Sequence, residues 1–309
     1  MTLFSKRDRS RPEERRSGPG LVRALLSGKP EPEPGVHVSE LEAARRKIEK
    51  VEAKRREHKN ELKRLREQNA EQERDLASLE RALRRLLDDC GALPLPPPEL
   101  REHVGRRPYP GNFLAHGMES SGRVLETFGT DPGGPVLDWG CGSGRTLTWL
   151  RRHPAWLAHY HGCDVDEAAI AWLTSQGVER VQVCADLPPL PYADNSFVGL
   201  FCFSVLTHIL PERHAAWYAE MRRVLRPGGR AYVTVHSDQN MASGKSFSDA
   251  ERAAYLEQGW SWSERDGHYK HAATVTKAFT LEAVGELLQV ERYRKGGYHQ
   301  MDDLVLRKG

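Results

Sequence analysis

The sequence is poor in cysteine, and the cysteines that it has do not form pairs. There are five in 309 residues, and no two are arranged as Cys-x-x-Cys. An odd number without such pairs is not the framework of a disulfide-rich or zinc-bound fold, and no metal site is expected. Three of them fall in or beside apolar runs, so we expect reduced core residues in a cytoplasmic protein. The cysteines are Cys90, Cys141, Cys163, Cys184 and Cys202.

Long apolar runs are also missing. No run reaches the roughly 20 residues that cross a bilayer. The N-terminus carries charges but lacks the apolar stretch of a secretory signal. We therefore expect no membrane span and a cytoplasmic location.

Most of the chain lacks an excess of one charge. Residues 1–90 hold 23 Lys and Arg against 18 Asp and Glu, a net of +5, whereas residues 91–309 hold 23 against 25, a net of −2. The larger part is therefore not basic, which argues against a nucleic-acid partner. Only the basic N-terminal tail leaves that alternative open.

The first 37 residues are predicted to form a disordered, basic tail. Arg and Lys are mixed there with Ser, Pro and Gly, and Pro30–Pro34 closes the segment. A solvated tail is the simplest interpretation. The alternative is contact with an anionic surface, with Leu21–Leu26 as a short apolar anchor.

Residues 38–90 have the pattern of a coiled coil. With Leu41 as position a, ten of the fourteen a and d positions through Leu86 are apolar, and neither Gly nor Pro interrupts them. One straight helix of this length would span roughly 70 Å. Asn69 at an a position favours a defined register and few strands. We expect self-association through residues 41–87; the alternative is a single solvated helix that folds back on the rest of the chain.

Prolines end this helical pattern. Residues 91–98 are predicted to be a stiff Pro-rich linker. Residues 99–128 are predicted to form short helices, which contain Tyr109, Phe113 and Gly117. Phe113 either covers a ligand there or packs against the sheet that follows.

From residue 136 onward, strand-like runs alternate with helical patterns. This order predicts an α/β fold with a mainly parallel sheet and helices on both faces. Ligands of such sheets bind at the carboxyl ends of the strands. The predicted strands are 136–139, 159–164, 181–184, 198–203 and 230–236, with a closing pair at 290–294 and 303–307. The predicted helices are 144–153, 167–174, 211–224 and 280–288.

The first strand runs into a glycine-rich loop within Val136–Arg145. Gly140, Gly142 and Gly144 carry no side chain that would keep a ligand away, and the following helix offers unpaired N–H groups. A dinucleotide fingerprint would place its third glycine one residue later, where this chain has Arg145. The loop therefore suits a nucleotide-like ligand, and its spacing argues against a nicotinamide-dependent dehydrogenase.

The segment Asp138–Gly144 resembles motif I of the class I S-adenosylmethionine-dependent methyltransferases. Over roughly residues 95–309 the chain is similar to the type 11/25-like domains of that class, and residues 99–309 are expected to be this domain. The resemblance implies a Rossmann-like, seven-stranded sheet, preceded here by the long coiled-coil helix, and S-adenosylmethionine as cofactor. The implied cofactor contacts are Asp138, Gly140, Cys141, Gly142, Gly144, Asp164, Val165, Asp186, Leu187 and Ser204.

Two acidic residues at strand ends have the clearest expected roles. Asp164 follows the second predicted strand, where a carboxylate can accept both ribose hydroxyls. The alternative is that Asp164 caps the next helix, as Asp166 also could. Asp186 can accept the adenine amino group while Leu187 covers the ring.

Two further segments add to the resemblance. Pro191–Phe197 looks like the family segment Pro-x-x-Asp-x-Ser-Phe, although Val198 stands where the family usually has Asp. Arg226–Gly229 resembles the family's turn into the fifth strand.

The acceptor side is expected at the ends of the fourth and fifth strands. His208 is the candidate general base, because imidazole titrates near neutral pH, but it could equally hydrogen-bond a helix end. Residues 237–279 exceed what a turn needs and predict a lid or substrate-binding insert, or else an ordinary packed excursion. His299 and Gln300 are expected to add polar groups to the same rim. The candidate substrate-binding residues are His236, Trp260, Tyr269 and His271.

These observations predict an enzyme that transfers a methyl group to an oxygen or nitrogen atom of a small-molecule or glycan acceptor. S-adenosylmethionine carries an activated leaving group, so the protein would mainly position and desolvate the reactants. The alternative is a coiled-coil scaffold with a cofactor-binding but non-catalytic domain. The acceptor does not follow from the sequence, because one fold serves many acceptors.

Overall fold

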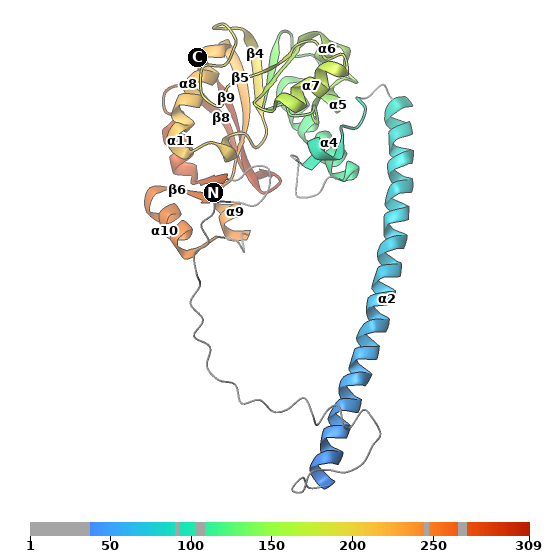
Figure 1. Cartoon of the computed structure of the whole chain (residues 1–309). Helices are drawn as coiled ribbons and strands as arrows, with labels where there is room; N and C mark the ends of the chain where they lie inside the picture. Colours follow the sequence, from blue (N-terminus) through green and yellow to red (C-terminus); the bar gives the residue numbers. More distant parts are fainter. Residues whose placement is uncertain (1–37, 90–92, 103–108, 244–246, 265–270) are drawn as a thin grey trace, which may run out of the picture. The chain divides into compact units, whose positions relative to one another are not determined.

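A computed structural model gives the fold of the chain (Figure 1). It describes residues 38–89, 93–102, 109–243, 247–264 and 271–309. The chain divides into two units, Met1–Leu76 and Ala77–Gly309. The predicted tail, Cys90 and Tyr269 lie outside the described residues.

The first described element, α2 (Val38–Asp89), is one unbroken helix of 52 residues, which confirms the predicted long helix. Val51, Leu62 and Leu65 of the apolar seam are exposed along it. The ion pairs between neighbouring turns are exposed as well, so each stabilises the helix only slightly. A helix of this kind gains most of its stability when its apolar face is covered. The coiled coil itself stays a prediction.

Seven strands form one sheet in the order β3-β2-β1-β4-β5-β9-β8, which confirms the predicted Rossmann-like, seven-stranded sheet. β1 to β5 are parallel, and β9 runs antiparallel between β5 and β8. The order changes direction between β1 and β4, where open sheets of this kind bind ligands. The strands are β1 (Val136–Trp139), β2 (Tyr160–Asp164), β3 (Val181–Val183), β4 (Phe197–Cys202), β5 (Leu225–Val235), β8 (Gln289–Tyr298) and β9 (Met301–Arg307).

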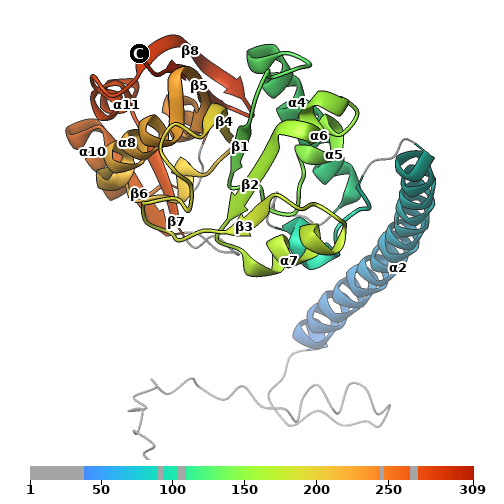
Figure 2. The ribbon, with the colours of Figure 1, turned by 90° about the horizontal axis from the view of Figure 1, so that it is seen from above.

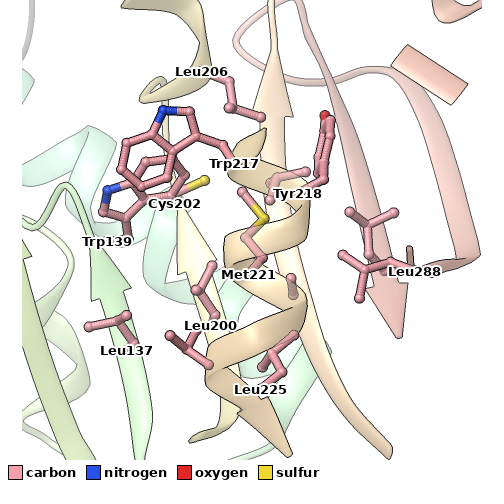
Figure 3. Close-up of a cluster of buried hydrophobic side chains, with 14 of the residues drawn as sticks. Leu137, Trp139, Leu200, Cys202, Leu206, Trp217, Tyr218, Met221, Leu225 and Leu288 are labelled. Atoms are coloured by element: carbon pink, nitrogen blue, oxygen red, sulfur yellow. The ribbon is translucent and has the colours of Figure 1, made fainter. Parts of the chain in front are cut away.

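Helices cover both faces of the sheet (Figure 2). Alternate strand residues point to opposite faces, so Leu137 and Trp139 join one buried cluster and Val136 joins the other. On the first face Trp139 stacks on Trp217, with ring centroids 4.3 Å apart (Figure 3). The helices of the first face are α8 (His214–Val224) and α11 (Lys277–Val284), and those of the second are α4 (Pro110–Phe128), α5 (Leu147–Leu150), α6 (Pro154–His159) and α7 (Glu167–Ser175).

Several elements differ from their predicted bounds. The predicted helix 144–153 is the short α5, and α6 starts separately at Pro154. β5 begins five residues early, at Leu225, and its pairing with β4 skips residues 226–229. Gly228 has a φ of +77° in this bulge, as a tight turn requires. α11 ends at Val284, so its predicted last turn belongs to the approach to β8.

The described part of the Pro-rich linker packs on the second unit. Leu93 and Leu95 are buried there, ahead of the short helix α3 (Pro98–Arg101). Phe113 is buried with Leu95 and Leu114 near α5, not against the sheet. These residues fix the linker to the domain, which a free spacer would not do.

The insert after β5 is folded. α9 (Asp238–Ser243) and α10 (Asp249–Gln258) precede a separate two-stranded sheet of β6 (Trp260–Glu264) and β7 (His271–Val275). Ser248 and Glu251 form a capping box at the start of α10. The Val275 N–H donates to the His236 carbonyl at 3.0 Å, which attaches β7 to the end of β5. None of the helices in the described ranges is long and apolar enough to cross a membrane.

Candidate functional site

The glycine-rich loop joins the end of β1 to α5. Gly140, Gly142 and Gly144 all have left-handed φ values, of +79°, +50° and +81°. A Cβ atom added to Gly140 would clash with Val205, and one added to Gly144 would lie 2.7 Å from Leu173. These two glycines let the loop pack closely against its neighbours.

Gly142 differs from the other two glycines. A Cβ atom there would meet only Asp164 Oδ2, at 4.0 Å, so the backbone of Gly142 faces open space. It is the position of this loop at which a ligand can approach the main chain.

Asp164 holds the loop in place from the end of β2. Its Oδ2 accepts the Gly142 N–H at 2.7 Å, and its Oδ1 accepts the Asp166 N–H at 3.0 Å. Asp166 Oδ1 itself accepts the Ala168 and Ala169 N–H groups and caps α7. The alternative that Asp164 caps this helix is therefore wrong. Burial raises the pKa of Asp164 despite these bonds, and each oxygen keeps a lone pair for a further donor.

Exposed apolar side chains follow β2 and β3. Val165 is 51% exposed and Leu187 44% exposed, on adjacent strand ends. Asp186, beside Leu187, is exposed too. The Cys184 N–H donates to the Asp164 carbonyl at 2.9 Å and keeps the two strand ends together. This arrangement offers apolar surface for a planar ring beside two carboxylates.

Asp138 lies inside the sheet below the loop. Tyr160 donates its hydroxyl proton to Asp138 Oδ2 at 2.9 Å. Burial raises the pKa of Asp138 to about 7, against the effects of the Tyr160 hydrogen bond and the Arg145 charge. Cys141 is buried as well, and its N–H donates to the Cys163 carbonyl at 3.1 Å. Both residues therefore support the loop from below.

Ser204 follows β4 with a left-handed φ of +61°. Its N–H donates to Thr234 Oγ1 at 2.8 Å, and its hydroxyl lies 2.9 Å from Thr207 Oγ1. These bonds fix the turn that leaves β4. The predicted cofactor contact of Ser204 stays a prediction.

His208 connects the end of β4 to the insert. It is half-buried at the end of the short 3₁₀ helix η2 (Leu206–His208), and its Nδ1 lies 3.0 Å from the His271 carbonyl oxygen. An N–H at Nδ1 would donate to that carbonyl. His271 begins strand β7, so this contact is to a strand and not to the helix end that was the alternative for His208, and the catalytic role stays a prediction.

The predicted substrate-binding residues divide between two places. His271 is exposed and stacks on Trp262, with ring centroids 5.0 Å apart. Trp260, in contrast, is half-buried and packs against the first core cluster. His236 is half-buried where β5 meets β7. The structure thus brings His208, His271 and Trp262 together and places Trp260 apart.

Two residues of the same rim lacked any local signal. His116 and Glu119 of α4 contact His299, about 180 positions later in the chain. Of these three residues, the sequence predicted only His299 at this rim, because the pairing of α4 with the last hairpin is not encoded in a local pattern. In the part of the chain that the structure describes, no group of three His, Cys, Asp or Glu residues could hold a metal ion.

Comparison with known proteins gives a consistent set of relatives. A family model described as a methyltransferase domain matches residues 137–233. Methyltransferase GfsG of Streptomyces halstedii is 37% identical over 140 residues, which cover 42% of this chain and 49% of that protein. O-methyltransferase cnsE of Penicillium expansum is 30% identical over 104 residues, which cover 32% and 36%. The chain thus spans half or less of the length of these curated relatives.

The fold also has a solved counterpart. The PH0226 protein of Pyrococcus horikoshii OT3 is 18% identical, with a TM-score of 0.50, over 64% of this chain and 92% of that one. At this identity the likeness concerns the fold.

Proposed function

We propose that the chain is an S-adenosylmethionine-dependent methyltransferase that transfers a methyl group to an oxygen or nitrogen atom of a small-molecule or glycan acceptor. The match of residues 137–233 to a methyltransferase-domain family model and the similarity to Methyltransferase GfsG support this proposal. The observation that carries the proposal is the open backbone at Gly142, held by the buried carboxylate of Asp164.

The residues at the ends of β1, β2 and β3 fit S-adenosylmethionine. The Gly142 backbone would lie along its methionine part, and Asp164 would accept the ribose hydroxyls with its remaining lone pairs. Val165 and Leu187 would cover the adenine, with Asp186 as an acceptor for the amino group. The bound group would supply a methyl already attached to a positively charged sulfur, so this chain would mainly orient the acceptor and exclude water.

The acceptor would bind over the ends of β4 and β5. The stacked pair Trp262 and His271 offers an aromatic surface there, and His208 lies beside it. The relative cnsE is an O-methyltransferase, which supports transfer to oxygen. The insert would then act as part of the acceptor site.

We also propose that α2 joins copies of the chain through residues 41–87. The exposed Val51, Leu62 and Leu65 on one unbroken helix support this. Light scattering of the full chain should give a multiple of the monomer mass. Leu62→Glu combined with Leu65→Glu should return the monomer, and a monomeric wild-type chain would contradict the proposal.

We propose a cytoplasmic location as well, which the free, buried cysteines among the described residues support.

The test of the enzymatic proposal is methyl transfer itself. Purified full-length protein would be incubated with methyl-labelled S-adenosylmethionine and a panel of alcohols, phenols, amines and glycosides. Label should appear in an acceptor with wild type and with Asp166→Ala, but not with Asp164→Ala. Donor binding without transfer to any member of a broad panel would favour the non-catalytic scaffold.

A further inference from the structure

Two stacked histidines and a glutamate join α4 to the tip of the β8–β9 hairpin. The rings of His116 and His299 have centroids 4.1 Å apart and planes 23° apart. His299 Nε2 lies 3.1 Å from Glu119 Oε2, one turn along α4 from His116. The donor site proposed above uses none of these three side chains.

The hairpin tip holds His299 in a backbone conformation that histidine seldom adopts. Tyr298 pairs with Met301, so His299 and Gln300 are the two turn residues, with φ values of +46° and +65°. Two-residue turns with positive φ at both positions favour Asn and Gly. The turn conformation alone therefore does not account for a histidine here, whereas the contacts of its side chain do.

The tip lies at the edge of the sheet that carries the donor site. β9 is antiparallel to β5, and Asp302 pairs with Val235, the last residue of β5. The tip thus extends beyond the carboxyl end of β5. Tyr298 also packs on Phe203, just after β4, with ring centroids 4.8 Å apart.

α4 places His116 next to the glycine-rich loop. A Cβ atom on Gly117 would lie 2.5 Å from the Arg145 carbonyl oxygen, so helix and loop are in close contact. Ser120 Oγ lies 2.9 Å from Thr146 Oγ1, one turn further along. The histidine pair therefore sits between the loop and the ends of β4 and β5. An acceptor bound over β4 and β5 approaches a donor on Gly142 from this side.

The groups around His116 and His299 decide which imidazole nitrogen of His299 can take a proton. The charged and titratable groups that face it are Glu119 on α4, Arg145 on the loop and Tyr298 on β8. Burial, together with His299 and Arg145, lowers the pKa of His116 to about 4, so His116 is neutral near pH 7. The 3.1 Å distance from His299 Nε2 to Glu119 favours the neutral form with its proton on Nε2, in which the lone pair is on Nδ1. Nδ1 has no hydrogen-bond partner among the described residues, and 35% of the side-chain surface is exposed.

We propose that His299 is the base that takes the proton from a hydroxyl acceptor, an alcohol or a phenol, and that Glu119 and His116 are positioning residues for it. This rests on the proposed methyltransferase function. As the acceptor oxygen bonds to the methyl carbon, the carbon–sulfur bond breaks and its electron pair stays on sulfur. The hydroxyl proton passes to Nδ1 of His299 and later to solvent. The products are the methyl ether and the demethylated donor.

The direct test observes the imidazole in the wild-type chain. Full-length protein with ¹⁵N-labelled histidine would be titrated with S-adenosylhomocysteine, the demethylated donor, and followed by NMR and calorimetry. His299, assigned from the spectrum of His299→Gln, should carry its proton on Nε2 in the neutral form. Its signals and those of His116 should shift on binding. The signals of His159 should not shift, because it lies just before β2, at the end of that strand away from the proposed site.

The outcomes separate this proposal from the function on which it rests. Calorimetric binding without a shift at His299, or a neutral form protonated on Nδ1, would overturn the assignment of the base and leave the proposed function intact. Absence of calorimetric binding would contradict the proposed function, and the base with it.

Variants add a kinetic test with the hydroxyl acceptor that gives most turnover. His299→Gln should lower kcat at least ~100-fold, the usual contribution of a general base, while affinity for S-adenosylhomocysteine changes less than about threefold. Glu119→Gln should lower kcat less, and it should shift the pH profile of kcat because the carboxylate charge that stabilises the protonated imidazole is lost. His159→Gln should match wild type. An unchanged kcat in His299→Gln, with only a lower melting temperature, would show that the stack is structural and overturn the proposal.

Discussion

The proposed donor and acceptor halves of the sheet edge are built in different ways. β1, β2 and β3 end in a site made of main chain, short side chains and one bracing carboxylate, all within residues 138–187. β4, β5 and the β8–β9 hairpin end among side chains from α4, the insert and the last turn. The donor half depends on a loop that tolerates few substitutions. The acceptor half consists of separate elements that can each be altered in sequence without the others, as a site for variable acceptors requires.

The largest expected effect is in the donor half. Asp164→Ala should weaken S-adenosylmethionine binding about 100-fold, because a charged hydrogen-bond acceptor contributes roughly 1.5–3 kcal/mol. Calorimetric titration measures this. Asp166→Ala is the matched control, since it removes only the cap of α7: it should cost about 1 kcal/mol of stability and leave affinity within about threefold. Equal affinity losses in both variants would remove the distinction between ligand contact and cap.

Substitutions of two glycines test whether one position of the loop serves packing and another serves ligand binding. Gly144→Ala should lower the free energy of unfolding by roughly 2–4 kcal/mol, since the new Cβ combines left-handed strain with a 2.7 Å contact to Leu173. Gly142→Ala should cost only the strain, about 1–2 kcal/mol, but should weaken donor binding, though by less than Asp164→Ala does. Urea denaturation and calorimetry separate the two. A variant of Gly142 that binds normally would contradict the open-backbone argument.

The buried carboxyl group under the loop makes a pH-dependent contribution. The pKa of Asp138 is about 7 in the folded chain, against 3.8 for an unperturbed aspartate, so the folded form binds more protons between these values. Stability should therefore fall as pH rises from about 4 to 7 by comparison with Asp138→Asn. The difference should be at most about 4 kcal/mol, because each pKa unit corresponds to about 1.4 kcal/mol. If the free energies of unfolding of wild type and Asp138→Asn differed by the same amount at every pH from 4 to 8, the raised pKa of Asp138 would be contradicted.

The smallest effect is expected at the acceptor rim. Trp262→Ala removes the stacking partner of His271 and should lower kcat/KM for the acceptor about fivefold, since an aromatic contact contributes roughly 1 kcal/mol. S-adenosylhomocysteine affinity should stay unchanged. A loss of donor affinity equal to the loss in kcat/KM would show that the two halves are not independent.

What the sequence could predict follows the same division. The alternation of strands and helices along the chain and the glycine-rich loop are local patterns, and both were predictable. The choice between Asp164 and Asp166 as helix cap was not, because either carboxylate can cap and only the hydrogen bonds to Ala168 and Ala169 decide. The burial of Leu93 could not be predicted from a proline-rich segment.

The acceptor rim shows the limit most clearly. The contact of His116 with His299 depends on how α4 packs against a hairpin at the far end of the chain. No periodicity or spacing links two such residues, so tertiary packing alone brings them together. The alternation of side chains along a strand could not predict that Trp260 and Trp262 have different surroundings either, because residues two apart point to the same face. Their surroundings differ because Trp260 pairs with Val275, which belongs to the core, whereas Trp262 lies further along β6 and meets His271.

The most direct test of the central claim, that the ends of β1 to β3 hold a methyl donor, is a calorimetric titration of the full chain with three ligands. S-adenosylmethionine and S-adenosylhomocysteine should both bind saturably, and NAD should not bind. Saturable binding of NAD, or no binding of either sulfur compound, would contradict the account.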